Sequence, residues 1–486
     1  MPPKKILSIA AAFLLSFLFL SQRHSGAEEG NHSQKPNHSQ KLNIVLFVTD
    51  DQSPDTGCYG NDAIKTPHLD QLAKEGTRFD RAFCTTASCS ASRSVILTGL
   101  FNHANGQYGH AHSYHHFKTK QSVKSLSVHL ADAGYRTARV GKYHVAPDEL
   151  YPFDQAIKGN SRHPVEMAEN CRSFISSEKA KPFFLYFCTS DPHRGGGTYP
   201  GDPNKPNAFG NKVKPRSGLK KISYDPGRVK VPEFLPDTAV CRSEIAQYYE
   251  SCSRIDQGLG KLVEILKTAG VYENTVVIFT SDHGMAFPGA KTTVYEGGLR
   301  VPYVIRHPQL KTETGDSQAM ISHVDITPTI LDIAGHKPKN YKFHGRSILP
   351  TLKSAPEKNW QTVYASHTFH EITMYYPMRV VRTDRYKLIW NIAHPLPYPF
   401  ASDLWAAPTW QDVYKQGPNA LYGKRTVQQF IQRPEFELYD LKNGTTETRN
   451  LAESPEHQEL LKNLKSKMRK FQIRTGDPWK LKWEYE

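Results

Sequence analysis

Four short stretches of this 486-residue chain have the residue pattern of strands buried inside a sheet. Three of them are continuous apolar runs, which are typical of strands covered on both faces. Helical patterns lie between the strands, including Thr66–Gly76 and Ser243–Ala269. The four stretches are Asn43–Thr49, Tyr135–Val140, Pro182–Cys188 and Thr275–Ser281. Strands that alternate with helices predict an α/β fold.

Charged or imidazole side chains follow each of these strands at its carboxyl end. Ligands of open α/β sheets bind at this edge, so four such placements together predict a functional site. Asp50 and Asp51 would repel each other unless a cation neutralised them, and their hard oxygens suit Ca²⁺ or Mg²⁺. A solvated loop or a helix cap is the alternative for this pair. The side chains concerned are Asp50 and Asp51, Lys142 and His144, Asp191 and His193, and Asp282 and His283.

A loop of small hydroxyl residues runs from Thr85 into a short predicted helix that Gly99 can end. Cys89 would lie at the start of this helix, where free N–H groups and the helix dipole favour an anion. Arg93 follows one turn later and adds a fixed positive charge. The combination indicates covalent chemistry on an oxyanion, and the alternative is a small buried cysteine without a chemical role.

The segment from Cys89 to Arg93, with Leu97-Thr98-Gly99 after it, resembles the Cys-x-Pro/Ala-x-Arg signature of the formylglycine-dependent sulfatases. The resemblance extends from Ile44 to Trp479. It implies an alkaline-phosphatase-like fold, in which helices flank a large mostly parallel sheet and a smaller C-terminal domain holds an antiparallel sheet. It also implies that Cys89 is oxidised after translation to formylglycine, whose hydrated aldehyde is the nucleophile.

The resemblance further implies a metal centre and a set of positively charged side chains. Ca²⁺ is the expected cation, with Mg²⁺ less favoured. The implied metal ligands are Asp50, Asp51, Asp282, His283 and the modified side chain of Cys89. The residues implied to neutralise charge on the sulfuryl oxygens, together with the metal, are Arg93, Lys142 and Lys291.

Two histidines and four further residues complete the implied site. His144 is expected to orient or deprotonate the aldehyde hydrate, and His193 to protonate the leaving group. The candidate substrate contacts are Asp191, His370, Glu371 and Arg379. For the last three of these, a network at a domain interface is the alternative.

Several stretches resemble the sulfamidase branch of the family, which acts on N-sulfated glucosamine of heparan-type chains. They are Asn105–Gly109, His115–Phe117, Gly141–Val145 and His370–Arg379. The expected reaction is therefore removal of an N-sulfate group from a sulfated glycan. Three alternatives stay open: an O-sulfatase on another polysaccharide, a phosphatase or phosphonate hydrolase, and a non-catalytic glycan binder whose Cys89 is unmodified.

Five histidines lie between residues 103 and 116, and their spacing is irregular. No cysteine or paired acids accompany them, so a zinc site is not expected. We expect these side chains to line the cleft near Cys89, and a polar surface is the alternative. The five are His103, His110, His112, His115 and His116.

Residues 1–27 have the pattern of a signal peptide, with Lys4-Lys5, an apolar run and the small residues Ser25-Gly26-Ala27. The run is shorter than the roughly 20 residues that span a bilayer, so no stable membrane span is expected. Export to the periplasm or medium is predicted, or to the lysosome in a eukaryote. The net charge of +15 suits a sulfated polysaccharide partner better than nucleic acid.

Residues 28–42 are expected to be a disordered linker before a catalytic domain of residues 43–355. A smaller α+β subdomain of residues 356–486 would follow, ending with the predicted helix Glu456–Phe471. With Cys89 set aside for modification, six cysteines remain and could pair in an oxidising compartment. The expected partners are the glycan, a maturation enzyme for Cys89 and a second copy in a homodimer.

Overall fold

The computed structural model describes residues 41–195, 205–214, 216–312, 315–353, 358–442, 444 and 446–485. The predicted signal peptide and nearly all of the predicted linker lie outside these residues. No helix in the described part of the chain is long and apolar enough to cross a membrane.

An eight-stranded sheet forms the centre of the fold, in the order β5-β4-β6-β1-β7-β8-β2-β9. The four predicted strands are its adjacent central members and run parallel, which confirms the α/β prediction. They are β1 (Asn43–Thr49), β4 (Arg136–Gly141), β6 (Phe183–Cys188) and β7 (Thr275–Ser281). The other four are β2 (Thr77–Phe79), β5 (Gln155–Ile157), β8 (Tyr303–Arg306) and β9 (Asp316–Ser317). Only β8 pairs antiparallel, with β7 and β2.

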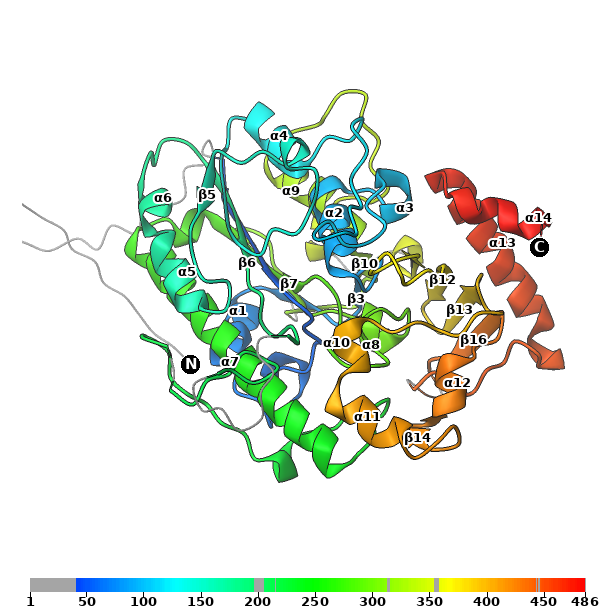
Figure 1. Ribbon diagram of the computed structural model, residues 1–486. Coiled ribbons are helices and arrows are strands. Elements are labelled where there is room, and N and C mark those ends of the chain that lie inside the picture. The colour runs from blue at the N-terminus through cyan, green and yellow to red at the C-terminus, as the bar shows by residue number, and fades with distance from the viewer. Residues whose placement is uncertain are drawn as a thin grey trace, which may run out of the picture. The chain divides into compact units, whose positions relative to one another are not determined.

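Helices cover both faces of this sheet (Figure 1). Alternate residues of β1 enter two different cores because successive side chains of a strand point to opposite faces. Val45 and Phe47 join the core formed with α1 (Pro67–Glu75), α5 (Pro164–Asn170) and α7 (Ala239–Thr268). Ile44, Leu46 and Val48 join the core formed with α2 (Cys89–Thr98), α4 (Leu126–Asp132) and α9 (Ile326–Ile333).

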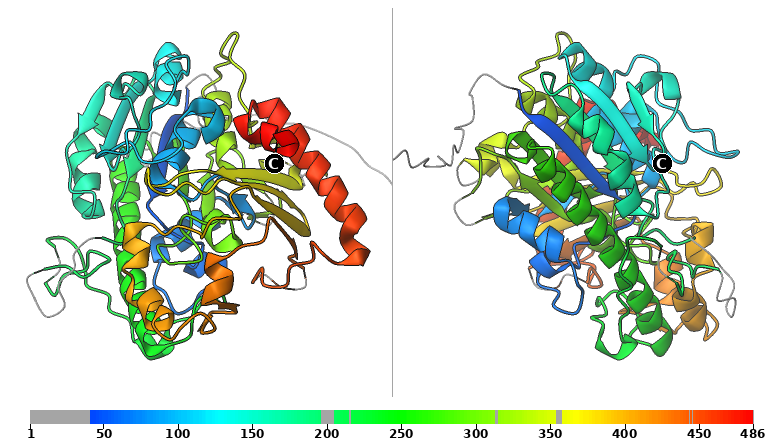
Figure 2. Two further views of the ribbon diagram at one scale, coloured as in Figure 1. Left: turned by 45° about the vertical axis from the view of Figure 1, so that its right-hand side comes forward. Right: turned by 90° about the vertical axis from the view of Figure 1, so that its left-hand side faces the viewer.

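A second, four-stranded antiparallel sheet lies in the C-terminal part of the chain (Figure 2). Its strands in order are β11 (Thr362–His367), β12 (Met378–Thr383), β13 (Tyr386–Asn391) and β16 (Phe436–Asp440). The helix α13 (Gln458–Thr475) contributes Leu461, Leu464 and Met468 to the core on one face of this sheet. The predicted small antiparallel sheet and its helix are confirmed, while the domain boundary at residue 355 stays a prediction.

The remaining elements are short. The helices are α3 (Asn102–Asn105), α6 (Arg172–Ser176), α8 (Glu296–Leu299), α10 (Ser402–Trp405), α11 (Pro408–Tyr414), α12 (Val427–Ile431) and α14 (Lys482–Tyr485). The strands are β3 (Ala82–Phe83), β10 (Ile321–Ser322), β14 (Leu421–Tyr422) and β15 (Arg425–Thr426).

Two features differ from the sequence-based expectation. The sequence of Thr77–Phe83 predicts a single strand after the helix Thr66–Gly76, but β2 ends at Phe79 and β3 begins at Ala82 in a separate sheet with β10. The chain is held at this break because Arg300 Nε donates to the Asp80 carbonyl oxygen. In addition, all seven cysteines are free thiols, so no disulfide joins the six that could have paired.

Candidate active site

The residues after β1 and β7 meet at the carboxyl edge of the large sheet. The backbone N–H of Asp282 donates to the Thr49 carbonyl oxygen at 3.0 Å, which holds the two strand ends together. Asp51 adopts a left-handed backbone, with φ of 60°, and its N–H donates to Asp282 Oδ1 at 3.0 Å. His283 Nε2 lies 3.0 Å from Asp51 Oδ1. All of these side chains, with Asp50, are fully buried.

Two glycines allow the chain to turn sharply at this edge. Gly284 follows His283, and a Cβ there would lie 1.8 Å from the Gly297 carbonyl oxygen. Gly141 ends β4 with φ of +81°, and a Cβ there would lie 2.0 Å from the Cys188 carbonyl oxygen. Only glycine fits such positions. The turn at Gly141 directs Lys142 toward the carboxylates of β1.

Cys89 begins α2, as predicted, and the helix ends at Gly99 in the left-handed conformation. The thiol is fully buried, with Sγ 3.3 Å from His283 Nε2 and 3.7 Å from Asp51 Oδ1. Burial raises the pKa of Cys89 well above its ordinary value, although Lys142 opposes the shift. An unmodified Cys89 is therefore a neutral thiol and a weak nucleophile at neutral pH.

Three cations face the three carboxylates of this edge, and we call these six residues with Cys89 and His283 the strand-end cluster. Arg93 bridges two acids, with Nη2 3.2 Å from Asp50 Oδ1 and Nε 3.0 Å from Asp282 Oδ2. Lys142 Nζ lies 2.6 Å from Asp50 Oδ2, and Lys291 Nζ lies 3.1 Å from Asp51 Oδ2. The predicted convergence of these residues is thus present in the fold.

The buried charges shift one another's pKa values. Burial alone would raise the pKa of Asp50, but Lys142, His193 and Arg93 hold it well below the usual value. Burial alone would lower the pKa of Lys291, but Asp403 and Asp51 hold it well above the usual value. Both groups are therefore ionised at neutral pH although their side chains are buried.

The donor set fits a hard divalent cation. Asp51, Cys89, Asp282 and His283 each offer an atom within 4.8 Å of those of the other three, and Asp50 and Asp51 form a similar group with His193. Carboxylate oxygens are the ligands that such cations prefer. An oxygen in place of the Cys89 sulfur would extend this oxygen-rich set.

His144 and His193 lie on either side of the cluster. His193 Nε2 is 3.0 Å from Lys291 Nζ and 3.9 Å from Asp51 Oδ2. His144 has φ of 61°, and its Nε2 is 2.6 Å from His112 Nδ1. Burial, followed by Lys291 for His193 and by Lys142 for His144, lowers both pKa values well below the usual range. Both imidazoles are therefore neutral at neutral pH.

Two of the predicted substrate contacts, Asp191 and Arg379, are paired with other residues inside the protein, which argues against that role. Asp191 is fully buried, with Arg162 Nη1 2.8 Å and Arg254 Nε 2.7 Å from its two oxygens. Arg379 is fully buried against Asp477, with Nη2 2.9 Å from Asp477 Oδ1 and Nε bound to Oδ2. Neither charge is free for a substrate, because each already has a buried partner.

The other two predicted contacts lie closer to the cluster. His370 is buried, with Nδ1 3.0 Å from Ser88 Oγ, next to Cys89. Glu371 is half-buried and accepts hydrogen bonds from Ser402 N at 3.0 Å and Ser402 Oγ at 2.8 Å. Glu371 therefore caps α10, and its contact with a sugar stays a prediction.

Sequence reasoning missed Asp403, which α10 brings to the cluster. Its Oδ2 lies 2.8 Å from Lys291 Nζ. Asp403 also lines an adjoining cavity of about 780 Å³, together with Arg194, Asn207, Glu244 and Pro408. No motif marks this aspartate, because only the fold brings it to a lysine 112 positions earlier.

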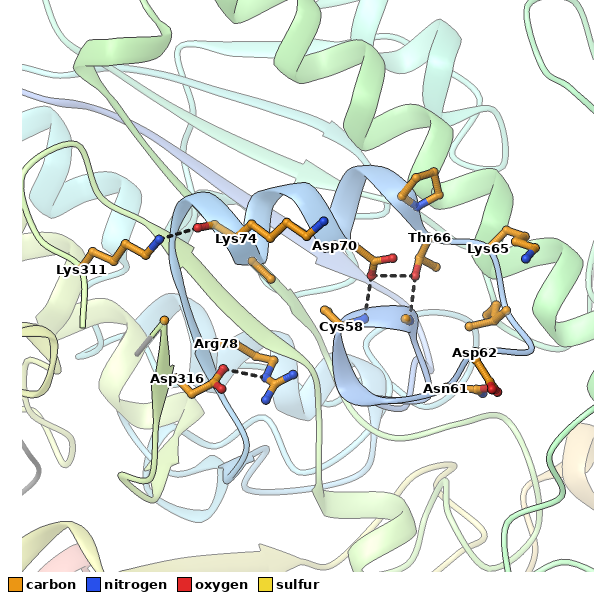
Figure 3. A pocket seen from close by; sticks show the side chains of 15 residues that line it. Cys58, Asn61, Asp62, Lys65, Thr66, Asp70, Lys74, Arg78, Lys311 and Asp316 are labelled. Atoms are coloured by element: carbon orange, nitrogen blue, oxygen red, sulfur yellow. Dashed lines mark hydrogen bonds and ion pairs between the residues drawn. The ribbon is translucent and has the colours of Figure 1, made fainter. Parts of the chain in front are cut away.

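A second cavity, of about 790 Å³, is lined by none of the predicted site residues (Figure 3). It lies beside α1 and the turn of Gly57–Tyr59. Its polar groups are largely paired with one another: Asp70 Oδ1 accepts from Cys58 N and Thr66 Oγ1, and Arg78 Nε lies 3.1 Å from Asp316 Oδ1. The strand-end cluster is the stronger candidate for chemistry.

Comparison with known proteins gives two family matches along the chain. Residues 42–336 match the sulfatase family, and residues 283–415 match the family described as N-sulphoglucosamine sulphohydrolase, C-terminal. The chain is 38% identical to the N-sulphoglucosamine sulphohydrolase of Homo sapiens, over 90% of this chain and 91% of that protein. It is 31% identical to an ulvan-active sulfatase of Formosa agariphila, over 90% and 81% respectively.

Solved structures share the fold at lower sequence identity. A protein in complex with its substrate D-glucosamine-2-N,6-O-disulfate matches with a TM-score of 0.66 and 22% identity, covering 90% of this chain and 99% of that one. A phosphonate monoester hydrolase from Silicibacter pomeroyi matches with a TM-score of 0.64 and 18% identity, covering 91% and 97%.

Proposed function

The chain belongs to the sulfatase family, and from this premise we propose that it removes the N-sulfate group from glucosamine residues of a heparan-type glycan. The observation that carries the proposal is the similarity to the human N-sulphoglucosamine sulphohydrolase over nine-tenths of the chain. The C-terminal family match supports it, because residues 283–415 include Lys291 of the cluster and His370 and Glu371 beside it. Family membership implies a formylglycine and a divalent metal.

We assign Ca²⁺ to the site and expect Asp50, Asp51, Asp282, His283 and the modified side chain of Cys89 to hold it. The carboxylates supply the hard oxygens that this cation prefers. When bound, the metal supplies positive charge that polarises the sulfuryl group, and the formylglycine hydrate supplies the attacking hydroxyl.

Arg93, Lys142 and Lys291 hold positive charge around the sulfuryl group. Their side chains are mostly or fully buried and bound to Asp50, Asp51 and Asp282, so their positions are fixed before substrate arrives. Preorganised charges in a buried site stabilise the negative charge that grows on the sulfuryl oxygens. Lys142 follows β4 and Lys291 lies in the loop after β7, and these are the two outer strands of the central four.

His193 is our candidate acid for the leaving group. An amine leaves with its proton only if a nearby group supplies one, so an N-sulfatase depends strongly on this step. The Lys291 ammonium donates a hydrogen bond to His193 Nε2 at 3.0 Å, which leaves the imidazole proton on Nδ1 for the leaving group.

His144 is our candidate base. Its Nε2 is bound to His112, while its Nδ1 is buried with no hydrogen-bond partner among the described residues. Because the imidazole is neutral, Nδ1 can take a proton from the hydroxyl that attacks sulfur.

The adjoining cavity lined by Asp403 is our candidate binding space for the rest of the glycan. Its volume of about 780 Å³ is sufficient for a small saccharide. The basic surface, an export signal in residues 1–27, a maturation enzyme for Cys89 and a homodimer complete the proposal as expectations from the sequence.

An O-sulfatase is the second candidate function, because an N-acetylglucosamine-6-O-sulfatase of Bacteroides thetaiotaomicron is also similar, at 26% identity over 72% of this chain. The two functions separate in one assay. The protein is expressed in its native host, the mass of the peptide that bears Cys89 is measured, and turnover is compared on N-sulfoglucosamine, 6-O-sulfated N-acetylglucosamine and a phosphate monoester.

We expect the aldehyde mass and the highest kcat/KM on N-sulfoglucosamine. Higher turnover of the O-sulfated sugar would replace the N-sulfatase with an O-sulfatase. An unmodified thiol in the natively expressed protein, without turnover of any sulfated sugar, would remove the enzymatic function altogether.

A further inference from the structure

Three histidine rings form a triangle beside the strand-end cluster. His110 and His112 lie in the loop after α3, and His144 follows β4. The ring centroids are 4.8 Å apart for His110 and His112, 5.0 Å for His110 and His144, and 4.7 Å for His112 and His144. Each residue offers a nitrogen within 4.8 Å of those of the other two. The spacing of the histidines in residues 103–116 does not predict this group, because its third member, His144, comes from another segment.

The position of His110 is fixed by hydrogen bonds behind it. Its Nε2 is 2.9 Å from His370 Nε2, and His370 Nδ1 is 3.0 Å from Ser88 Oγ. If His370 donates to Ser88, then His370 Nε2 accepts from His110 Nε2–H, and His110 Nδ1 carries a lone pair. Hydrogen bonds of this kind orient histidines that bind metals.

An unsatisfied buried atom points to a ligand at this place. His110 is 7% exposed, and its Nδ1 has no hydrogen-bond partner among the described residues. A buried polar atom without a partner lowers the stability of the fold, so its retention calls for an explanation. A bound metal ion would satisfy it.

The three imidazoles are in the protonation state that a metal requires. Burial lowers the pKa of His110 to about 2 and lowers those of His112 and His144. The charges that face the group are mixed: Lys142 and Lys291 are positive, while Asp50 and Glu371 are negative. A cation therefore meets neutral ligands in surroundings without a strong excess of positive charge.

We propose that His110, His112 and His144 form a second metal site that binds Zn²⁺ or a similar transition metal, and that its occupation inhibits the enzyme. Imidazole nitrogens suit Zn²⁺, Cu²⁺ and Ni²⁺, whereas Ca²⁺ prefers oxygen. Three histidine ligands leave the fourth tetrahedral position open to water. His112 is exposed, which gives the ion a path of entry.

Inhibition is expected because His144 belongs both to the proposed metal site and to the catalytic site. His144 is our candidate base, and the ion would hold it in place and withdraw its electrons. Zn–N bonds of about 2.0–2.1 Å require the contact between His112 and His144, now 2.6 Å, to open slightly. The exposed His112 can move to allow this.

The test uses the full-length, Ca²⁺-loaded protein with formylglycine at position 89. Zn²⁺ binding is measured by calorimetry, Co²⁺ binding by its visible absorption, and inhibition relative to each variant's own uninhibited rate. His112→Asn removes one ligand, and His116→Asn is the matched control, since His116 is exposed in the same loop and outside the triangle.

We expect one Zn²⁺ per chain in addition to Ca²⁺, and a tetrahedral Co²⁺ spectrum. His112→Asn is expected to weaken Zn²⁺ binding and to raise the half-inhibitory concentration by about 10- to 100-fold. His116→Asn keeps both values. Wild-type Zn²⁺ affinity in His112→Asn would overturn the proposal, and so would inhibition that excess Ca²⁺ relieves, because that places Zn²⁺ at the carboxylates. Calorimetry and Co²⁺ absorption do not depend on which sulfate is hydrolysed.

Discussion

The strand-end cluster and the Arg379–Asp477 pair both bury full charges, but they differ in how those charges are paired. Asp477 takes two donors of one guanidinium, and the remaining Arg379 nitrogen donates to the carbonyl oxygens of His367 and Met378. In the cluster, by contrast, Asp51 is shared between His283 and Lys291. The charges of the Arg379–Asp477 pair neutralise each other without a ligand. In the cluster, a metal ion can bind the carboxylates, and a sulfate group can bind the cations.

This difference predicts that substitutions in the cluster affect activity and that substitutions in the pair affect stability. The variants below are ordered from the largest expected effect to the smallest.

Cys89→Ala is expected to lower kcat/KM on N-sulfoglucosamine by more than about 10⁴-fold, or about 5 kcal/mol of transition-state stabilisation. The nucleophile is lost, while the smaller alanine fits the buried helix start. Cys58→Ser is the control, since Cys58 lies at the other cavity. Steady-state kinetics and thermal unfolding of both variants check this, and a Cys89→Ala enzyme with substantial activity would contradict it.

Asp477→Asn is expected to lower the free energy of unfolding by about 3–5 kcal/mol, because Arg379 would remain buried without its counter-charge. The folded fraction should keep its kcat/KM, since the pair does not touch the cluster. Chemical denaturation and kinetics on the same sample test both statements. A large loss of kcat/KM without a loss of stability would return Arg379 to the substrate site.

The pH dependence of the free energy of unfolding of Asp477→Asn tests whether the Asp477 carboxylate is the group responsible. Burial alone would raise the pKa of Asp477, but Arg379 holds it below its usual value. A depressed pKa contributes stability that is complete above the unfolded value of about 3.9 and is lost as the pH falls below it. The difference between wild type and variant should stay constant from about pH 7 to 5 and shrink below about pH 4. Shrinkage above pH 5 would implicate another group.

Asp51→Asn is expected to weaken Ca²⁺ binding by at least about 100-fold, or about 3 kcal/mol, because a charged ligand is lost. Calorimetry on protein stripped of metal with a chelator measures the Ca²⁺ affinity. Adding Ca²⁺ back to the stripped wild-type protein should restore its activity. The exposed Asp62, which pairs with Lys230 on the surface, provides the control Asp62→Asn. Equal Ca²⁺ affinities in the two variants would exclude Asp51 as a ligand.

Substitutions of Glu371 test whether this residue supports the fold of α10 or contacts the substrate. Glu371→Ala removes the cap of α10, which carries Asp403, and we expect KM to rise about 3- to 10-fold with little change in kcat. Glu371→Gln keeps an acceptor for Ser402 and should lie near wild type. If both variants raise KM equally, the carboxylate itself contacts the sugar.

The four central strands and the charges at their ends could be predicted from the sequence because each depends on neighbouring residues. An apolar run forms the strand, and the next residues lie at its carboxyl end in any parallel sheet. Asp50, Asp51, Lys142, Asp282 and His283 were found in this way. The role of Lys291 came from the resemblance to the family.

The partners of individual side chains could not be predicted in the same way. Asp477 lies 98 positions after Arg379 in the sequence, and nothing local marks their contact. The same holds for Asp403 and for the meeting of His112 with His144. In each case the contact depends on tertiary packing, which brings two unrelated segments together.

The position of β1 between β6 and β7 has a consequence for how this chain can vary. Both neighbours fix its alignment, with Leu46 opposite Tyr186 on one side and Ile278 on the other. A change of size within the strand is a local disturbance, but insertion or deletion of one residue reverses which face each side chain occupies. An insertion would move Asp50 to the place of Asp51, and a deletion would move Asp51 to the place of Asp50, so in either case one aspartate would leave its position in the cluster. The length of β1 is therefore constrained by the site at its end, while the identity of its side chains is constrained by packing in the two cores.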